Sequence, residues 1–195
     1  MRIVAEHLSY TYNEKSPFET AALHDVTLTI EEGEFFGIIG HTGSGKSTFV
    51  QHLNGLIRLP ASLKHAKKHK AKRGQPLPPA PVLKVGEFDL SDKKTDFRAL
   101  RRHVGMVFQY PESQLFAETV RDDVAFGLKN FSEKKLTEEE IDGAVRAALE
   151  VVGLNFDELK EQSPFELSGG QKRRDLRASP SPAPRMVQDG RHRLA

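Results

Sequence analysis

An octapeptide placed between an apolar run and a helical pattern constrains the fold of this chain more than any other feature. The octapeptide is GHTGSGKS, at Gly40–Ser47, and the apolar FFGII run within Glu34–Ile39 precedes it. Such a run is typical of a strand buried on both faces, and we expect a strand there. The order strand, glycine-rich loop, helix predicts an α/β fold. From Lys46 onward one helical stripe is apolar, at Phe49, Val50, Leu53, Leu56 and Ile57.

The octapeptide matches the pattern G-x-x-x-x-G-K-[ST], whose chemistry suits phosphate groups. Its glycines allow backbone conformations that turn successive N–H groups inward, and the helix adds the positive end of its dipole. We expect Lys46 to reach the β- and γ-phosphates of a nucleotide and to act in catalysis, and the Ser47 hydroxyl to ligate Mg²⁺. A structural glycine turn is the alternative. The predicted binding residues are Gly40, His41, Thr42, Gly43, Ser44, Gly45, Lys46 and Ser47.

A second glycine-rich motif, LSGGQ, lies at Leu167–Gln171. Ser168 is a good N-cap, and Gly169 and Gly170 leave backbone amides open at a helix start, which makes a second anion site. A plain helix cap explains Ser168 but not two glycines followed by Gln171. Together the two motifs resemble the nucleotide-binding subunits of ABC transporters, in which LSGGQ is the signature motif. The resemblance implies that Ser168, Gly169, Gly170 and Gln171 close over the γ-phosphate held by an opposite subunit, with ATP and Mg²⁺ bound in a dimer.

Three further positions match the same family one at a time. Gln109, at the end of VGMVFQ, resembles the Q-loop glutamine, which touches the metal and the attacking water and relays to the membrane partner. An ordinary polar residue at a strand end is the alternative. Tyr12 resembles the aromatic residue that stacks on adenine, with Tyr10 two residues away as the other candidate. Thr48 is expected near the α-phosphate.

Two longer segments narrow the resemblance. FQYPESQLFAETVRDDVAFG and SPFETAALHDV are similar to the energy-coupling-factor ATPases, which drive uptake of vitamins and of cobalt or nickel. The SPFE sequence at residues 16–19, which opens the second of these segments, favours the second of their two ATPase components. The resemblance implies a P-loop NTPase of the ABC type, with an antiparallel β subdomain and a helical signature subdomain. It also implies a second ATPase subunit, a transmembrane coupling subunit and a substrate-binding membrane subunit as partners, at the cytoplasmic face of the cell membrane.

One domain accounts for most of the 195 residues. We place it at residues 1–174, interrupted at 61–81 by a basic, proline-rich insertion that is typical of a solvated linker. Lys64–Arg73 carries the basic residues, and the rest of the chain is mildly acidic although the net charge is +2. This distribution argues against a dedicated nucleic-acid binder. The insertion could instead act as a peptide ligand or contact anionic lipid, and the absence of cysteine excludes disulfides and thiolate metal sites.

The remaining elements follow from caps and periodicity. Thr137–Val152 has the clearest helical pattern, because Thr137 and Glu140 form a capping box and Gly153 ends the apolar stripe. The other expected elements are a strand at Arg2–Tyr12, an alternating strand at Val26–Ile30, ordered chain at Val82–Leu90, a buried strand at Val104–Phe108 and a short helix at Glu118–Leu128.

The family pattern ends after Arg174. In the family the signature helix continues with small apolar residues, and a buried strand then leads to a metal-binding Asp, a catalytic Glu and a switch histidine. Here Asp175 opens a Pro- and Ser-rich tail, residues 175–195, which we expect to be disordered. Asp189 and His192 receive no role because no apolar strand leads to either. The prediction is a fold incomplete at its C-terminus, whose missing central strand exposes its neighbours.

Without those carboxylates we expect weak nucleotide binding and very slow hydrolysis from this polypeptide alone. A change of reading frame or a misassembled gene end is one hypothesis for the tail. The leading function is ATP-driven import. The alternatives are a non-hydrolysing nucleotide-binding interaction module and a soluble relative that acts on nucleic acid through the basic insertion.

Overall fold

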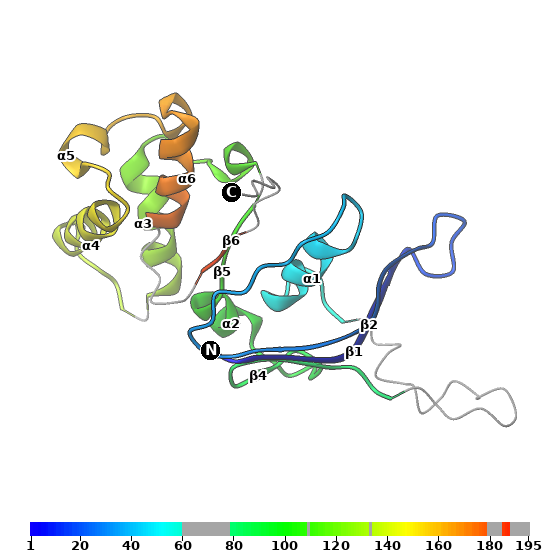
Figure 1. The fold of residues 1–195 in the computed structure, drawn as a ribbon. Coiled ribbons are helices and arrows are strands. Elements are labelled where there is room, and N and C mark those ends of the chain that lie inside the picture. The colour runs from blue at the N-terminus through cyan, green and yellow to red at the C-terminus, as the bar shows by residue number, and fades with distance from the viewer. Residues whose placement is uncertain (60–78, 109, 133, 179–184, 188–195) are drawn as a thin grey trace, which may run out of the picture. The chain divides into compact units, whose positions relative to one another are not determined.

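The computed structural model describes residues 1–59, 79–108, 110–132, 134–178 and 185–187 (Figure 1). The chain divides into two units, Met1–Arg101 and Arg102–Ala195, and each is described by itself. The first unit carries the octapeptide and the second carries LSGGQ. The predicted basic segment Lys64–Arg73 lies outside the described residues.

A four-stranded antiparallel sheet forms the first unit, with the strand order β2-β1-β3-β4. The strands are β1 (Ile3–Tyr12), β2 (Thr20–Ile30), β3 (Val82–Val85) and β4 (Phe88–Asp89). Along the end of β2, half-buried or buried apolar residues alternate with exposed threonines, as the period-2 pattern predicted. The predicted antiparallel subdomain is therefore confirmed, with β1 paired on both sides.

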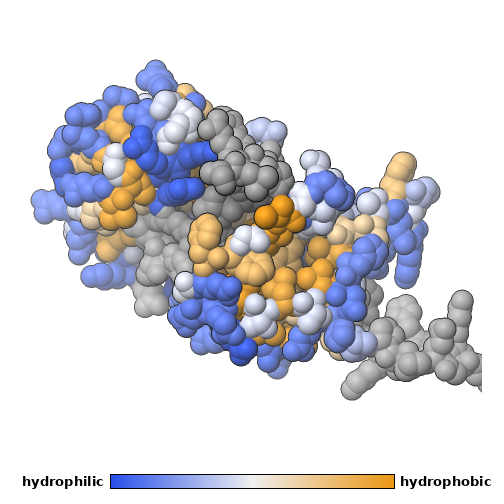
Figure 2. Space-filling view, in the orientation of Figure 1, coloured by the Kyte–Doolittle hydropathy of each residue, from blue (hydrophilic) through white to orange (hydrophobic). Residues whose placement is uncertain are grey.

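The apolar run before the octapeptide does not form the expected strand. Residues 34–40 have no strand assignment, and no described strand pairs with them. Phe35 is fully exposed and Ile39 is 79% exposed. A strand needs hydrogen-bonded neighbours, so apolar composition alone did not suffice. Figure 2 shows hydrophobic residues gathered on the visible face of the first unit.

Helix α1 (Lys46–Leu53) begins at Lys46 within the octapeptide, as predicted, but it is shorter than the apolar stripe suggested. The backbone of Gly55 is left-handed (φ 68°), which ends the helix and leaves Leu56 half exposed. A further helix that the sequence did not predict, α2 (Phe97–His103), secures this end. Its Arg101 guanidinium donates to the carbonyl oxygens of Asn54 (3.3 Å) and Gly55 (3.1 Å).

The second unit is mainly helical. Its elements are β5 (Gly105–Val107), the 3₁₀ turn η2 (Pro111–Gln114), α3 (Val120–Phe131), α4 (Glu138–Val151), α5 (Phe156–Leu159), η3 (Pro164–Glu166), α6 (Gly169–Ala178) and β6 (Arg185–Val187). One apolar core joins α3, α4, α5 and α6 and agrees with the predicted helical subdomain. Its buried members are Val120, Val124, Ala125, Ile141, Val145, Leu149, Leu154, Phe156, Leu159, Leu167 and Ala178.

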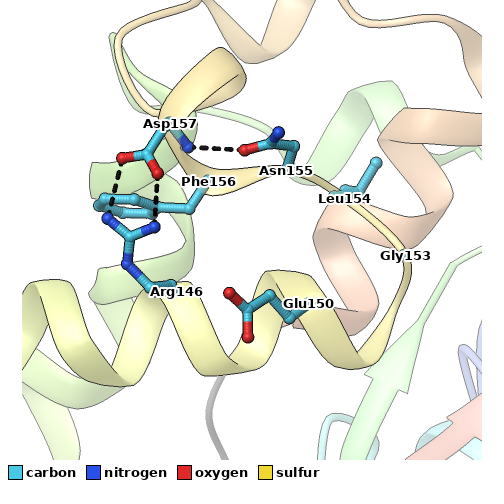
Figure 3. Close-up of a pocket in the computed structure, with 7 residues that line it drawn as sticks. All are labelled: Arg146, Glu150, Gly153, Leu154, Asn155, Phe156 and Asp157. Atoms are coloured by element: carbon cyan, nitrogen blue, oxygen red, sulfur yellow. Dashed lines mark hydrogen bonds and ion pairs between the residues drawn. The ribbon is translucent and has the colours of Figure 1, made fainter.

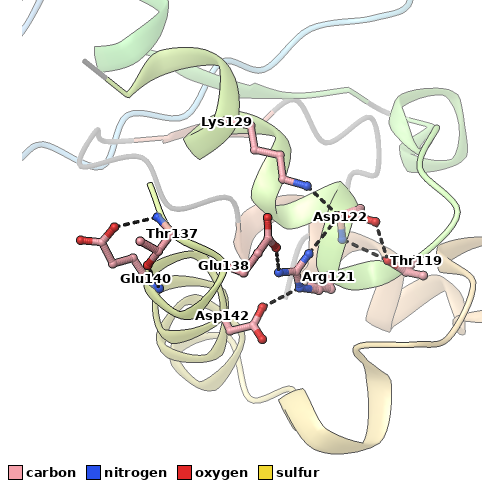
Figure 4. Close-up of polar contacts among 8 residues, drawn as sticks. All are labelled: Thr119, Arg121, Asp122, Lys129, Thr137, Glu138, Glu140 and Asp142. Atoms are coloured by element: carbon pink, nitrogen blue, oxygen red, sulfur yellow. Dashed lines mark hydrogen bonds and ion pairs between the residues drawn. The ribbon is translucent and has the colours of Figure 1, made fainter. Parts of the chain in front are cut away.

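Helix α4 confirms the clearest sequence pattern. Thr137 accepts from the backbone N–H of Glu140, whose carboxylate accepts from the N–H of Thr137 at 2.8 Å. An ion-pair network then joins α4 to α3, as Figure 4 shows. Arg121 of α3 contacts the carboxylates of Glu138 and Asp142 of α4, the second at 2.5 Å. The two carboxylates raise the pKa of Arg121, so this cation stays charged.

Part of the predicted tail is ordered. Helix α6 continues through Asp175 to Ala178, and β6 pairs in parallel with β5. Asp175 and Ala178 are both buried, because they lie three residues apart on the helix face that packs on the core. The expectation of disorder from Asp175 onward is therefore wrong for these two segments, and the other tail residues lie outside the described residues.

Candidate nucleotide-binding site

The octapeptide loop requires glycine for reasons that lie within the chain. Gly43 and Gly45 have φ values of 83° and 86°, in the left-handed region that side chains rarely adopt. A Cβ atom on Gly45 would lie 2.3 Å from the carbonyl oxygen of Ala22 on β2. A Cβ atom on Gly40 would lie 2.6 Å from Oγ of Ser44. The loop is therefore folded tightly on itself and against β2.

Lys46 turns its side chain back over this loop. Its Nζ donates to the carbonyl oxygens of Gly40 (2.5 Å) and His41 (2.8 Å), and lies 3.3 Å from Oγ of Ser44. His41, Thr42, Gly43, Ser44 and Ser47 are exposed around it. An ammonium group held over exposed backbone amides is a suitable cradle for an oxyanion.

The start of α1 is electrostatically unusual in this molecule. Its N-cap, Gly45, offers no side-chain acceptor, and its first turn contains no acid. Helices α3 and α4 have Asp or Glu in the first turn, and the Asp96 carboxylate accepts from two backbone amides at the start of α2. Those carboxylates occupy the positive ends of their helices. In the part of the chain that the structure describes, no acid caps the N-terminal end of α1, which makes this end a suitable place for an external anion.

Tyr12 lies beside the helix that leaves the loop. Its hydroxyl oxygen is 3.1 Å from Oγ1 of Thr48, which is itself buried. Tyr10 packs edge-to-face on Tyr12 and also on His52, with ring centroids 4.9 and 4.7 Å apart. Tyr10 thus contacts two other rings, whereas the hydroxyl of Tyr12 contacts Thr48 of α1. This favours Tyr12 over Tyr10 as the ring that could stack on a base.

LSGGQ opens helix α6 with a reciprocal cap. The hydroxyl of Ser168 accepts from the N–H of Gln171 (3.3 Å), and Oε1 of Gln171 accepts from the N–H of Ser168 (2.9 Å). This is a capping box of the S-x-x-Q type. A helix cap therefore accounts for Gln171 as well as Ser168, which the sequence interpretation had denied.

The two glycines of LSGGQ remain unexplained by the chain itself. Gly169 and Gly170 are exposed, neither has a positive φ, and a Cβ atom on either would meet nothing within 4 Å. The first turn of α6 again contains no acid. These residues leave two uncrowded amides at a positive helix end, a suitable place for a close-approaching anion.

Gln109 lies outside the described residues, so its predicted role is carried forward only as a proposal. A neighbouring glutamine, Gln114, which the sequence analysis did not single out, holds the backbone at the end of β5. Oε1 of Gln114 accepts from the N–H of Phe108 (2.9 Å), and its Nε2 donates to the carbonyl oxygen of Met106 (3.3 Å). Gln114 therefore fixes the backbone on both sides of the last residue of β5. A second glutamine so soon after VGMVFQ was the available signal.

Asp175, on the helix that LSGGQ opens, is a buried carboxyl group, and neither of its oxygens has a hydrogen-bond partner among the described residues. Burial raises its pKa to about 7, and the nearby charge of Asp123 adds to this. Asp123 accepts from the N–H groups of Phe116 and Ala117, and burial raises its pKa too. These two carboxyl groups resist ionisation together.

A shallow pocket of about 440 Å³ lies at the end of α4, and none of the predicted site residues line it (Figure 3). Arg146 and Asp157 form a two-pronged ion pair across it, at 2.6 and 2.8 Å. The Arg146 guanidinium also lies 4.4 Å from the ring centroid of Phe156. The Arg146–Asp157 ion pair therefore ties α4 to α5.

The described residues contain no group of three His, Asp or Glu side chains placed to hold a metal ion. Within the same residues, no helix combines the length and apolar character that a membrane span needs.

The geometry and the comparisons with known proteins agree on the class. The family model for the ABC transporter matches residues 23–176, which include the octapeptide loop and LSGGQ. The chain therefore belongs to the ABC transporter family. It is 44% identical over 174 residues to the energy-coupling factor transporter ATP-binding protein EcfA2 of Clostridioides difficile, and 49% identical to that of Symbiobacterium thermophilum. These alignments cover 89% of this chain, which spans about half the length of these relatives (53% and 52%).

Solved structures support the same fold. CbiO1 of Clostridium perfringens, part of the ABC transporter complex cbiONQ, is 31% identical with a TM-score of 0.67, over 91% of this chain and 59% of that one. A dimeric ATP-binding cassette bound to ADP and phosphate in a post-hydrolysis state is 24% identical with a TM-score of 0.72. That alignment covers 95% of this chain and 72% of the cassette. The predicted fold class, an ABC ATPase cassette, is confirmed.

Proposed function

We propose that this chain is the ATP-binding part of an energy-coupling-factor transporter, which powers uptake from the cytoplasmic face of the membrane. The observation that carries the proposal is the pair of acid-free, glycine-rich helix starts at α1 and α6. The similarity to EcfA2 proteins supports the subtype, and SPFE favours the second ATPase component. Vitamins or transition-metal ions are the proposed cargo class.

Each predicted residue has a physical task in this proposal. The loop amides and Lys46 bind the phosphates, and Ser47 with Gln109 would hold Mg²⁺. ATP binding is the part of the transport cycle that we assign to this chain, and we expect hydrolysis by this polypeptide alone to be very slow. The ring of Tyr12 stacks on the base, and the buried Thr48 holds the Tyr12 hydroxyl by a hydrogen bond. The exposed amides of Gly169 and Gly170 serve a phosphate held by a second ATPase subunit.

Exposed aromatic side chains in the second unit support a membrane-subunit partner. Tyr110 is 69% exposed, and Phe116 and Phe126 (60% and 47% exposed) pack edge-to-face with centroids 4.6 Å apart. They lie in and just after the segment that contains Gln109. Aromatic groups of this kind are enriched in protein interfaces. We therefore place the transmembrane coupling subunit against this surface, with a substrate-binding membrane subunit beside it.

Equilibrium binding of ATP with Mg²⁺ to the full chain tests the core of the proposal, with Lys46→Ala as the matched variant. We expect measurable binding that weakens at least tenfold, roughly, in the variant, because a charge-assisted contact to phosphate is lost. Equal binding by both proteins would sink the assigned site. Co-purification with the membrane subunits, followed by measurement of ATP turnover, separates a working ATPase from a module that only binds nucleotide.

A further inference from the structure

His52 is a buried imidazole to which the proposed function assigns no task. It lies in the last turn of α1 and is only 1% exposed. Its Nδ1 is 2.7 Å from the carbonyl oxygen of Thr48, and its Nε2 has no hydrogen-bond partner within the described ranges. A carbonyl oxygen only accepts, so Nδ1 carries the proton. Burial lowers the pKa of His52, which keeps the ring neutral.

Simple packing explains this residue poorly. A buried nitrogen without a partner is unfavourable, and an apolar side chain would fill the same space without that cost. What the imidazole adds is a hydrogen bond to one specific carbonyl together with a flat ring edge. The carbonyl belongs to Thr48, the residue that follows Ser47 of the phosphate loop.

The ring and the hydrogen bond of His52 each connect it to Tyr12 through a separate chain of contacts. Through space, the ring of His52 packs on Tyr10 at 4.7 Å and 77°, and Tyr10 packs on Tyr12 at 4.9 Å and 89°. Through Thr48, the His52 bond fixes the backbone of a residue whose Oγ1 lies 3.1 Å from the Tyr12 hydroxyl. Thr48, Tyr12, Tyr10 and His52 thus form a closed ring of contacts between β1 and α1.

We infer that His52 is a positioning residue that holds Tyr12 at a fixed place beside the phosphate loop, so that the base and the triphosphate of one nucleotide are bound in register. The inference rests on the proposed function, in which Tyr12 stacks on the base. A closed ring resists distortion at every member, and pre-set geometry removes ordering cost from binding. The energetic contribution of His52 should therefore appear only with ligands that carry a base.

Two ligands and two variants of the full chain test this. The ligands are ATP and inorganic tripolyphosphate, each with Mg²⁺, measured by calorimetry. His52→Phe keeps a ring but loses the bond to Thr48, and His52→Asn restores a donor without the ring. We expect His52→Phe to weaken ATP roughly three- to tenfold, the worth of one ordinary hydrogen bond, and to leave tripolyphosphate unchanged. His52→Asn should recover part of the loss.

Tyr12→Phe tests the same ring without touching the buried core, should either His52 variant fold poorly. It keeps the stacking ring and removes only the hydroxyl, so ATP should weaken while tripolyphosphate does not. Equal loss for both ligands, or no loss for ATP, would overturn the inference while the proposed function stands. Failure of the unaltered chain to bind either ligand would overturn the proposed function, and the inference with it.

Discussion

The two glycine-rich helix starts look alike in sequence and differ in what they require. At the phosphate loop, a Cβ atom on Gly45 would lie 2.3 Å from a carbonyl oxygen, whereas on Gly169 or Gly170 it would meet nothing within 4 Å. The first set of glycines is needed by the chain itself. No described residue fills the space beside the second set, which therefore stays open to a ligand or a partner. Similar motifs can therefore record internal packing in one place and external contact in another.

Gly45→Ala gives the largest expected effect. The new methyl group meets the Ala22 carbonyl, and the left-handed backbone adds about 1–2 kcal/mol of strain, so the loop must shift and ATP binding should be lost. Thermal unfolding and ATP calorimetry measure both effects. Gly169→Ala is the matched control, which should leave unfolding unchanged or slightly stabilised. Similar damage from both variants would break the comparison.

The helices behind the two motifs also differ in the titratable group that each one buries. Asp175 has a pKa raised to about 7, so the folded state favours its protonated form. The second unit should lose stability as the pH rises from about 4 to 7, on the order of 2–4 kcal/mol, since the unfolded carboxyl group ionises near ~4. Asp175→Asn should remove most of this slope and leave the part that comes from the buried Asp123, whose pKa is also raised.

His52 acts in the opposite direction, because its lowered pKa favours the neutral ring in the folded state. The first unit should lose stability as the pH falls below the ordinary histidine value of about 6.5. Hydrogen exchange resolved by segment distinguishes the two units. Parallel pH responses in both would contradict the assignment of these two groups.

The two regions also differ in the burial of the apolar residue that precedes the glycines. Leu167 is 4% exposed in the helical core, and Ile39 is 79% exposed in front of the phosphate loop. Leu167→Ala should cost about 2–4 kcal/mol in free energy of unfolding, as for other buried leucines. Ile39→Ala should change it by less than about 0.5 kcal/mol. Chemical denaturation of both variants provides the measurement, and a large cost at Ile39 would show that this residue is buried after all.

The cap of α6 should give a smaller effect than the buried Leu167. Ser168→Ala removes one half of the reciprocal cap and should cost about 1 kcal/mol, whereas Gly170→Ala should gain up to about 0.5–1 kcal/mol of helix propensity. If Gly170→Ala nevertheless abolishes turnover in the assembled transporter, its glycine serves the partner. Full turnover in that variant would remove the external reason for the second pair of glycines.

Local signals in the sequence predicted local structure well. The capping box at Thr137, the alternation in β2 and the helix at Lys46 depend on neighbours within a few residues, and all three are present. Failures came where distant segments decide. The 34–39 run lacks a described strand partner, and β6 exists through its pairing with β5, which no pattern near Arg185 reveals.

The candidate site divides in the same way. The loop motif predicted Lys46 and the glycines because their spacing carries the chemistry. His52 was missed, although a polar residue four positions after Thr48, within an apolar stripe, was a visible signal. The resemblance named Tyr12 but did not separate it from Tyr10, and only the contact with Thr48 does so.

Because the Lys46 side chain folds back over its own loop, an anion that binds there must replace the contacts that Lys46 already makes. Its ammonium group already has two carbonyl oxygens as acceptors, so an arriving anion must displace contacts of similar length. A singly charged anion competes poorly with two fixed dipoles, whereas a ligand that offers several oxyanions at once replaces them fully. In the proposed function, the loop would therefore favour a ligand that offers several oxyanions at once, such as a triphosphate, over a singly charged anion.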